Sequence, residues 1–318
     1  MYLEKIQSPE DVKKLDVEQL KVLAGEMRQA LIQKLSVHGG HVGPNLGMVE
    51  ATIAMHYVFD SPKDKMVFDV SHQSYCHKML TGRADAFLDE AKYDDVSGYS
   101  EPSESAHDFF CIGHTSTSVS LACGLAKARD LADENYNVIA VIGDGSLSGG
   151  EALEGLDFAK ELNGNLIVVV NDNEMSIAEN HGGLYENLKL LRDTKGQAEC
   201  NIFKAMGLNY VFVEDGNDLT QLIDAFKRVK DSKAPVAVHI HTLKGKGYTL
   251  AEENKESWHW HMPFDIETGK TKGNYDGGED YGTLTADYLL QKMKEDASVV
   301  AITSATPTVF GFTNDKRE

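Results

Sequence analysis

Hydrophobic positions follow a helical spacing in several parts of the chain. In 16–36 they recur every three or four residues, at Val17, Leu20, Leu23, Met27, Leu31 and Leu35, which predicts a helix. Asp16 precedes this run and Gln19 follows three residues later, as in a capping box, and Gly39-Gly40 would end the helix. Similar patterns predict helices at 45–58, 117–133, 149–162, 185–193 and 218–231.

Short apolar runs without strict alternation separate these helices. They predict strands at 66–70, 138–142, 166–170, 210–213 and 235–241. Strands of this kind, spaced by helices, are typical of a parallel sheet buried on both faces. We therefore predict an α/β fold, a parallel sheet with helices on both faces, whose ligands bind at the carboxyl ends of the strands.

The polar, glycine-rich stretch 265–282 predicts a linker. A helix at 284–293 and a strand at 298–303 would follow it. One helix and one strand cannot bury a core, so we expect one domain in 1–264, a linker in 265–282 and the start of an incomplete second domain in 283–318.

Composition excludes several classes of protein. Asp and Glu total 50 against 31 Lys and Arg, a net charge of −19, which disfavours a nucleic-acid partner. No apolar run approaches a membrane span, and the N-terminus does not resemble a signal peptide. The four cysteines form no CxxC pair, so we expect buried thiols in a cytoplasmic protein.

The glycine-rich loop 143–149 follows the strand at 138–142. It matches a loose dinucleotide-binding pattern, which would suggest an NAD-dependent oxidoreductase. However, Asp144 would then lie beside a pyrophosphate, and two anions at that distance repel unless a cation lies between them. The loop therefore favours a metal site that binds a diphosphate.

The next strand ends at Asn171-Asp172-Asn173. If the two strands are neighbours, Asp144 and Asn173 would offer a carboxylate and an amide oxygen to one ion, and the carbonyl of Met175 could be a third ligand. Oxygen ligands completed by phosphate and water are those that Mg²⁺ prefers. Either motif alone is commonly just a turn.

A set of ordered motifs resembles those of the 1-deoxy-D-xylulose-5-phosphate synthase family of thiamine-diphosphate enzymes, from about residue 18 onward. Besides the GDG and NDN motifs, the resemblance rests on FDVSHQ at 68–73 with HKMLTGR at 77–83, GHTSTS at 113–118, KGKGY at 244–248, and WH at 258–259 with FD at 264–265. NDNEMSI at 171–177 has this family's form rather than that of transketolase.

The resemblance implies a thiamine-diphosphate-binding fold and a set of roles. Residues 1–264 would form the diphosphate-type domain and 283–318 the start of the pyrimidine-type domain. Asp144, Asn173 and the Met175 carbonyl would bind Mg²⁺. The cofactor would contact His72, Gly113, His114, Thr115, Gly145, Ser146, Asn173 and Tyr248, and Lys244 and Lys246 would add positive charge. His41 and His259 would lie near the reacting centre, where a group that titrates near neutrality can move protons.

The implied reaction joins a 2-keto donor such as pyruvate to an aldehyde such as glyceraldehyde 3-phosphate. In this family a glutamate in an AEQ-type motif of the pyrimidine-type domain assists the cofactor, and this sequence has no such motif. We therefore expect the chain to be inactive without that domain, and to form a homodimer because these sites lie between domains and subunits.

Departures from the family leave the substrate open. Ser71 replaces a glycine, Asn217 replaces a histidine, and 101–105 lacks a basic residue. The segment between Ile177 and Phe203 is short for the family. Transketolase-type ketol transfer and a non-catalytic cofactor-binding or assembly subunit remain alternatives. His239 and His241 alternate on a strand, but without a third ligand packing or solvent exposure is favoured over zinc.

Overall fold

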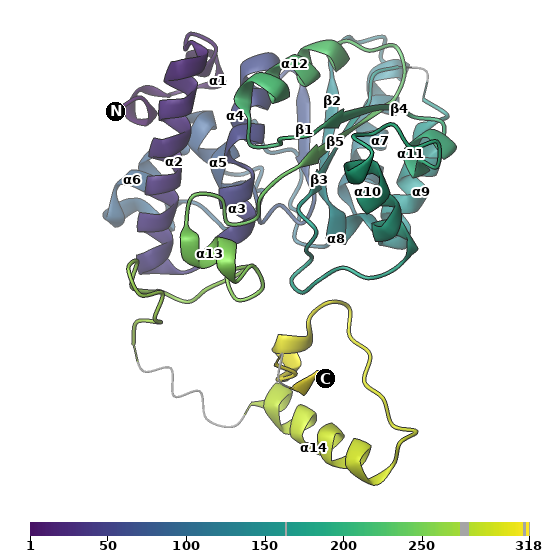
Figure 1. Ribbon diagram of the computed structural model, residues 1–318. Helices are drawn as coiled ribbons and strands as arrows, with labels where there is room; N and C mark the ends of the chain where they lie inside the picture. The colour runs from purple at the N-terminus through teal and green to yellow at the C-terminus, as the bar shows by residue number, and fades with distance from the viewer. Residues whose placement is uncertain (163, 274–279, 314–315, 318) are drawn as a thin grey trace.

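The computed structural model describes residues 1–162, 164–273, 280–313 and 316–317. Its centre is a five-stranded sheet in which every pairing is parallel and the strand order is β1-β2-β3-β5-β4 (Figure 1). The strands are β1 Lys65–Phe68, β2 Val138–Gly143, β3 Ile167–Asp172, β4 Asn209–Val213 and β5 Val236–His241. The predicted parallel α/β fold is confirmed.

Helices cover both faces of this sheet (Figure 1). The α-helices are α1 Pro9–Val12, α2 Val17–His38, α3 Gly43–Gly47, α4 Val49–Val58, α5 Tyr75–Lys78, α6 Asp85–Leu88, α7 Ser118–Leu131, α8 Asp144–Leu147, α9 Gly150–Ala159, α10 Gly183–Asp193, α11 Ile202–Ala205, α12 Leu219–Val229, α13 Thr249–Glu253 and α14 Tyr281–Glu295. Single turns of other helix types occupy Leu3–Lys5, Met79–Arg83, Glu90–Asp95 and Pro307–Phe310.

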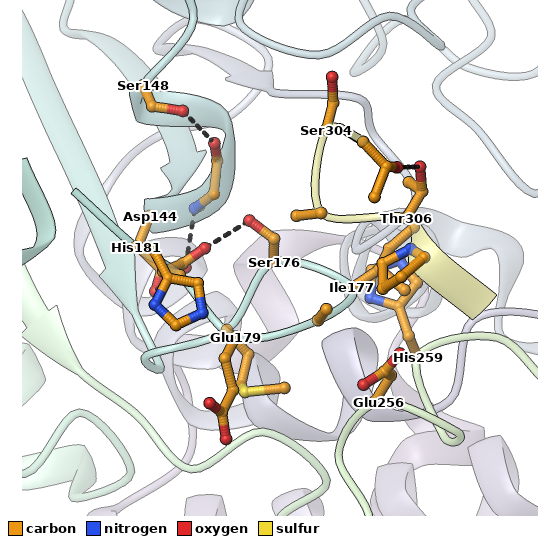
Figure 2. A pocket seen from close by; sticks show the side chains of 18 of the residues that line it. Asp144, Ser148, Ser176, Ile177, Glu179, His181, Glu256, His259, Ser304 and Thr306 are labelled. Carbon is orange, nitrogen blue, oxygen red and sulfur yellow. Dashed lines mark hydrogen bonds between the residues drawn. The ribbon is translucent and has the colours of Figure 1, made fainter. Parts of the chain in front are cut away.

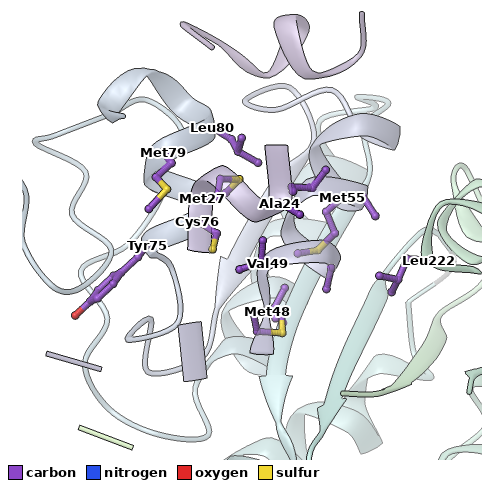
Figure 3. Packing of buried hydrophobic residues seen from close by; sticks show 14 of the residues in the cluster. Ala24, Met27, Met48, Val49, Met55, Tyr75, Cys76, Met79, Leu80 and Leu222 are labelled. Atoms are coloured by element: carbon purple, nitrogen blue, oxygen red, sulfur yellow. The ribbon is translucent and has the colours of Figure 1, made fainter. Parts of the chain in front are cut away.

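Successive residues of the strands belong to two separate cores, because side chains alternate between the two faces of a sheet. Ile139 and Val141 of β2 pack into the core under α2, α4 and α12, whereas Val138 and Ala140 pack into the core under α7 and α9. The first core is rich in methionine, with Met27, Met48 and Met55 close together (Figure 3). Burial on both faces explains why the strands are continuous apolar runs.

Helix α2 begins and ends where the sequence predicts. The Asp16 side chain accepts a hydrogen bond from the Gln19 backbone at 2.9 Å, and the Gln19 side chain accepts one from the Asp16 backbone, which completes the capping box. Gly39 ends the helix with a φ of 77°, a conformation that favours glycine. The helix expected at 45–58 is instead two helices, α3 and α4, which meet at Met48.

The C-terminal part differs from the expectation. The strand predicted at 298–303 is wrong, since no strand or pairing occurs there among the described residues, and Val300 and Ile302 are exposed. An apolar run needs a neighbouring strand to become part of a sheet. Helix α14 begins at Tyr281, inside the segment expected to be a linker. The first part of that segment is hydrogen-bonded to 1–264, for example by Tyr248 Oη to the Ile266 carbonyl.

No helix within the described ranges is both long and apolar enough to cross a membrane.

Candidate functional site

The two strand ends that the sequence singled out lie side by side. β2 and β3 are neighbours, and Gly143 of β2 pairs with Asn171 of β3. Asp144 begins α8 directly after β2, and Asn173 follows directly after β3. Both side chains are buried, with exposed fractions of 1% and 8%. A carboxylate and an amide oxygen therefore come from adjoining strand ends, as predicted, and both line a large cleft (Figure 2).

The carboxylate of Asp144 is held by two hydrogen bonds. The Gly145 backbone donates to Oδ1 at 3.0 Å, and the Asn180 side chain donates to Oδ2 at 2.9 Å. Burial, followed by the negative charge of Asp172 nearby, raises the pKa of Asp144 well above its usual value. A buried carboxylate in this state gains most from a bound cation, which supplies the missing positive charge.

The loop after Asp144 packs closely against Ser176 in the loop after β3, because Gly145 has no side chain. A Cβ on Gly145 would lie 2.3 Å from Ser176 Oγ and 3.0 Å from Ser176 Cα, so only glycine fits there. Ser146 is held from the opposite side, because Thr115 Oγ1 donates to its hydroxyl and Ser116 Oγ to its carbonyl, both at 2.7 Å. Gly113, His114 and Thr115 are exposed and line the same cleft.

Lys244 brings a positive charge to this cleft from the loop after β5. Its side chain is buried, and Nζ donates to the Ser176 carbonyl at 2.6 Å. Burial lowers the pKa of Lys244 to about 8, although Asp144 opposes the change. Lys246 does not line the cleft; its carbonyl accepts a hydrogen bond from Arg28 at 2.9 Å.

Three histidines cluster in the same cleft as Asp144 and Asn173. The ring centroids of His41 and His72 are 4.8 Å apart, those of His72 and His259 5.3 Å, and those of His41 and His259 5.6 Å. Burial lowers the pKa of all three, to about 4 for His41, so the imidazoles are neutral near pH 7. Nδ1 of His72 and Nδ1 of His259 are buried without a hydrogen-bond partner in the described protein. Buried polar atoms usually have a hydrogen-bond partner, so these two nitrogens are unusual and mark the cluster as a candidate functional site.

His239, one of the two histidines that alternate on a strand, has a structural role. His239 is fully buried, and its Nε2 lies 2.8 Å from Asp172 Oδ2. Burial lowers the pKa of His239. Burial opposes ionisation of Asp172, but hydrogen bonds from His239 and Arg192 outweigh it and lower the pKa. No group of three or more His, Cys, Asp or Glu side chains arranged to hold a metal occurs in the described parts of the chain. For His239, its burial and its contact with Asp172 fit the packing role that the sequence favoured.

Tyr248 is not brought to the cleft. It is buried, its hydroxyl donates to the Ile266 carbonyl at 2.8 Å, and its ring packs against Trp258 and Phe264. This arrangement does not support the expected contact with the cofactor. The expectation of four buried cysteines is also wrong, because Cys111 and Cys200 are exposed while Cys76 and Cys123 are buried. Cys111 and Cys200 lie outside the helices and strands.

Sequence reasoning missed several residues of the cleft. Asn180 reaches Asp144 only because the chain folds back after β3, where Met175 and Glu179 pair as an antiparallel bridge. Tyr99 does not line the cleft itself, but its ring centroid lies 6.1 Å from that of His41, which does. No local motif marks either residue. The only available signal was their proximity in sequence to recognised motifs.

The C-terminal segment forms another wall of the cleft. The Ala178 backbone donates to the Ala305 carbonyl at 3.1 Å, and Arg317 forms an ion pair with Glu256 at 2.6 Å. Ser304 and Thr306 line the cleft together with Ile177 and His259 (Figure 2). The resulting cleft has a volume of about 2320 Å³, enough for a cofactor and substrates together.

The described residues suit a diphosphate held through a divalent cation. They supply a buried carboxylate, an amide oxygen, a loop that only glycine can form, one buried lysine and two unpartnered imidazole nitrogens. Oxygen ligands of this kind suit Mg²⁺ rather than a softer metal.

Comparisons with known proteins identify the family to which the chain is similar. A family model described as 1-deoxy-D-xylulose-5-phosphate synthase matches residues 3–201 and 189–242. The chain is 42% identical to 1-deoxy-D-xylulose-5-phosphate synthase 1 of Geobacter sulfurreducens, covering 99% of the chain and 55% of that protein. It is 42% identical to the 1-deoxy-D-xylulose-5-phosphate synthase of Listeria monocytogenes, over 95% of the chain and 51% of that protein. The chain therefore spans about half the length of these curated relatives.

Solved structures agree at the level of the fold. Transketolase from Campylobacter jejuni has a TM-score of 0.62 at 18% identity, covering 94% of this chain and 46% of that one. Transketolase from Leishmania mexicana has a TM-score of 0.60 at 20% identity, covering 95% and 45%.

Proposed function

Because the chain belongs to the 1-deoxy-D-xylulose-5-phosphate synthase family, a family of transferases, we propose that it carries the diphosphate- and Mg²⁺-binding half of a thiamine-diphosphate-dependent carboligation site. The observation that carries this proposal is the pair Asp144 and Asn173 at adjoining strand ends, both buried and both lining one cleft.

The metal would be held by Asp144, by Asn173 and by the Met175 carbonyl. Gly145 and Ser146 would lie against the diphosphate at the start of α8, and Lys244 would offset part of its charge. His72 and His114 would flank the cofactor, with Gly113 and Thr115 beside them. The chain is strongly acidic, so a cation and these local donors are what allow it to hold an anionic ligand.

When bound, thiamine diphosphate would supply a carbon nucleophile for the carbonyl of a 2-keto donor, so that the donor can lose its carboxyl group as CO₂ and its remaining fragment can be joined to an aldehyde. His41 and His259 would exchange protons with the oxygens of donor and acceptor. Burial lowers the pKa of both histidines, so each imidazole is neutral at rest and would first act as a hydrogen-bonding group toward these oxygens. Pyruvate and a phosphorylated aldehyde such as glyceraldehyde 3-phosphate are the proposed substrates.

A pyrimidine-type domain would be needed for turnover, since the sequence contains no AEQ motif to supply the family's activating glutamate. We expect no product when the isolated chain is incubated with pyruvate, glyceraldehyde 3-phosphate, thiamine diphosphate and Mg²⁺. Product formed by the native chain and lost in Asp144→Ala would contradict this requirement. The same assay with a ketose donor would distinguish transketolase-type transfer. A homodimer remains a prediction, which light scattering would check.

Calorimetric titration tests the binding function itself. The native chain should bind thiamine diphosphate in Mg²⁺ and not in EDTA, and Asp144→Ala should abolish binding. The exposed Asp157 provides a control, because Asp157→Ala removes the same charge elsewhere and should leave binding unchanged. Binding in EDTA, or native binding by Asp144→Ala, would overturn the proposal. A non-catalytic subunit would bind in the same way but give no product even with the second domain present.

A further inference from the structure

A buried polar network lies directly behind the loop that carries Asn173 and Met175. Its centre is Asp172, the last residue of β3, whose side chain is fully buried. His239 of β5 approaches Asp172 Oδ2 with Nε2 at 2.8 Å, and Arg192 of α10 forms an ion pair with the same oxygen. Three separate elements therefore meet at one carboxylate.

The other oxygen of Asp172 holds the loop. Oδ1 accepts a hydrogen bond from the Glu174 backbone at 3.2 Å, and Glu174 has a φ of 68°, which is unfavourable for a residue with a side chain. Arg192 also reaches the Glu174 carboxylate, at 3.2 Å. Asn173 Oδ1 accepts from the Met175 backbone at 3.2 Å. Asp172 and Arg192 therefore both hold Glu174, the residue between the proposed ligands Asn173 and Met175.

The imidazole of His239 cannot turn within this network. Its Nδ1 lies 2.8 Å from the Tyr210 hydroxyl, and its ring packs against Phe212 at a centroid distance of 5.2 Å. With Nε2–H directed at Asp172, the Tyr210 hydroxyl donates to Nδ1. Both ring nitrogens are used, so the position of Asp172 is set by the sheet itself.

We propose that Asp172, His239 and Arg192 are positioning residues that hold the Asn173–Met175 loop rigid and so make the metal site select Mg²⁺ over the larger Ca²⁺. Mg²⁺ requires near-ideal octahedral geometry with ligands at about 2.0–2.1 Å, whereas Ca²⁺ accepts flexible ligand sets at about 2.3–2.6 Å. A loop that is held rigid by these residues favours Mg²⁺. A loop that can move adjusts to the longer ligand distances of Ca²⁺. This inference rests on the proposed function.

The test measures thiamine diphosphate affinity by calorimetry in saturating Mg²⁺ and in saturating Ca²⁺. Arg192→Met removes the positive charge and the hydrogen bonds of the guanidinium group. The thiamine diphosphate dissociation constant in Ca²⁺ divided by that in Mg²⁺ should then fall at least tenfold, mainly because affinity in Mg²⁺ is lost. Arg192→Lys should recover part of the ratio. Lys195→Met is the matched control, because Lys195 is a nearby exposed cation that pairs with Glu214.

A structural role alone would lower the melting temperature and weaken binding with both ions equally, so an unchanged ratio in Arg192→Met overturns the inference. If Arg192→Met does not fold, Tyr210→Phe tests the same network by freeing His239, and the ratio should again fall. If the native chain binds thiamine diphosphate with neither ion, the proposed function fails and this inference fails with it.

Discussion

Asn180 donates a hydrogen bond of 2.9 Å from Nδ2 to Oδ2 of Asp144, across 36 positions of sequence. Its own Oδ1 accepts from the Ser176 hydroxyl at 2.5 Å. Asn180 therefore joins the two loops that follow β2 and β3. It also fixes the orientation of the carboxylate that we propose as a metal ligand.

Asn180→Ala should weaken Mg²⁺-dependent binding of thiamine diphosphate about tenfold or more, because residues that orient a metal ligand typically contribute 10- to 100-fold in affinity. Calorimetric titration checks this result. Asn209→Ala serves as the control, since Asn209 is exposed at the start of β4. Unchanged affinity in Asn180→Ala would show that the hydrogen bond plays no part in binding.

Gly145→Ala should both destabilise the fold and abolish cofactor binding. The added Cβ would collide with Ser176, which must move together with the loop after β3. Such overpacking costs about 1–3 kcal/mol. Gly183 begins α10, and a Cβ added there would meet no atom within 4 Å, so Gly183→Ala should be neutral or slightly stabilising. Chemical denaturation of both variants gives the comparison, and equal stabilities would contradict it.

Much of the fold and of the cleft around Asp144 was predictable from the sequence, because these features depend on local patterns. The capping box at Asp16, the apolar strands and the succession of GDG and NDN motifs all act over short stretches of sequence. Two strands joined by one helix are commonly neighbours, so the adjacency of Asp144 and Asn173 followed from their order in the chain.

The features that the sequence did not predict depend on contacts between segments that are distant in the chain. β5 pairs with β3 and not only with β4, so His239 reaches Asp172 across 67 positions. Asn180 depends on a fold-back of the loop after β3. The run 298–303 has strand-like composition, but composition does not specify a pairing partner. Nothing in the pattern around Tyr248 distinguished a cofactor contact from packing against Trp258.

Asp69→Asn should destabilise the chain by about 1–3 kcal/mol. Asp69 accepts hydrogen bonds from the backbones of Ser116 and Ser118, each at 2.8 Å, and so fixes the start of α7 and the loop that carries His114. An asparagine can accept only one of them and turns an amide N–H toward the other. Asp85→Asn is the control, because Asp85 is exposed and pairs only with Lys92 at the surface. Urea denaturation should separate the two variants, and equal midpoints would contradict the assigned role.

Stability should fall as pH is lowered from about 6.5 toward 4. Burial lowers the pKa of His41 from 6.5 to about 4, so the unfolded chain binds a proton in this range and the folded chain does not. The contribution of the neutral His41 to the free energy of unfolding is fully present above pH 6.5. At pH 5, His41 alone should lower the free energy of unfolding by about 2 kcal/mol. His72 and His259 add to it, because burial lowers their pKa values as well.

His41→Gln should make the pH dependence of unfolding shallower in this range. His38→Gln is the matched variant, because it removes an exposed imidazole that does not line the cleft. Urea denaturation at pH 7.5, 6 and 5 measures the slope. An equal slope in native chain and His41→Gln would show that His41 binds its proton equally in the folded and unfolded chain, which contradicts a pKa lowered by burial.

The most direct measurement is a crystal structure of the chain with thiamine diphosphate and Mn²⁺ in place of Mg²⁺, with the ion located by its anomalous scattering. Our account predicts one peak at bonding distance, about 2.0–2.2 Å, from Asp144, Asn173 Oδ1 and the Met175 carbonyl, with diphosphate oxygens completing the octahedron. An ion bound elsewhere, or a cofactor bound in the cleft without an ion at Asp144, would contradict it.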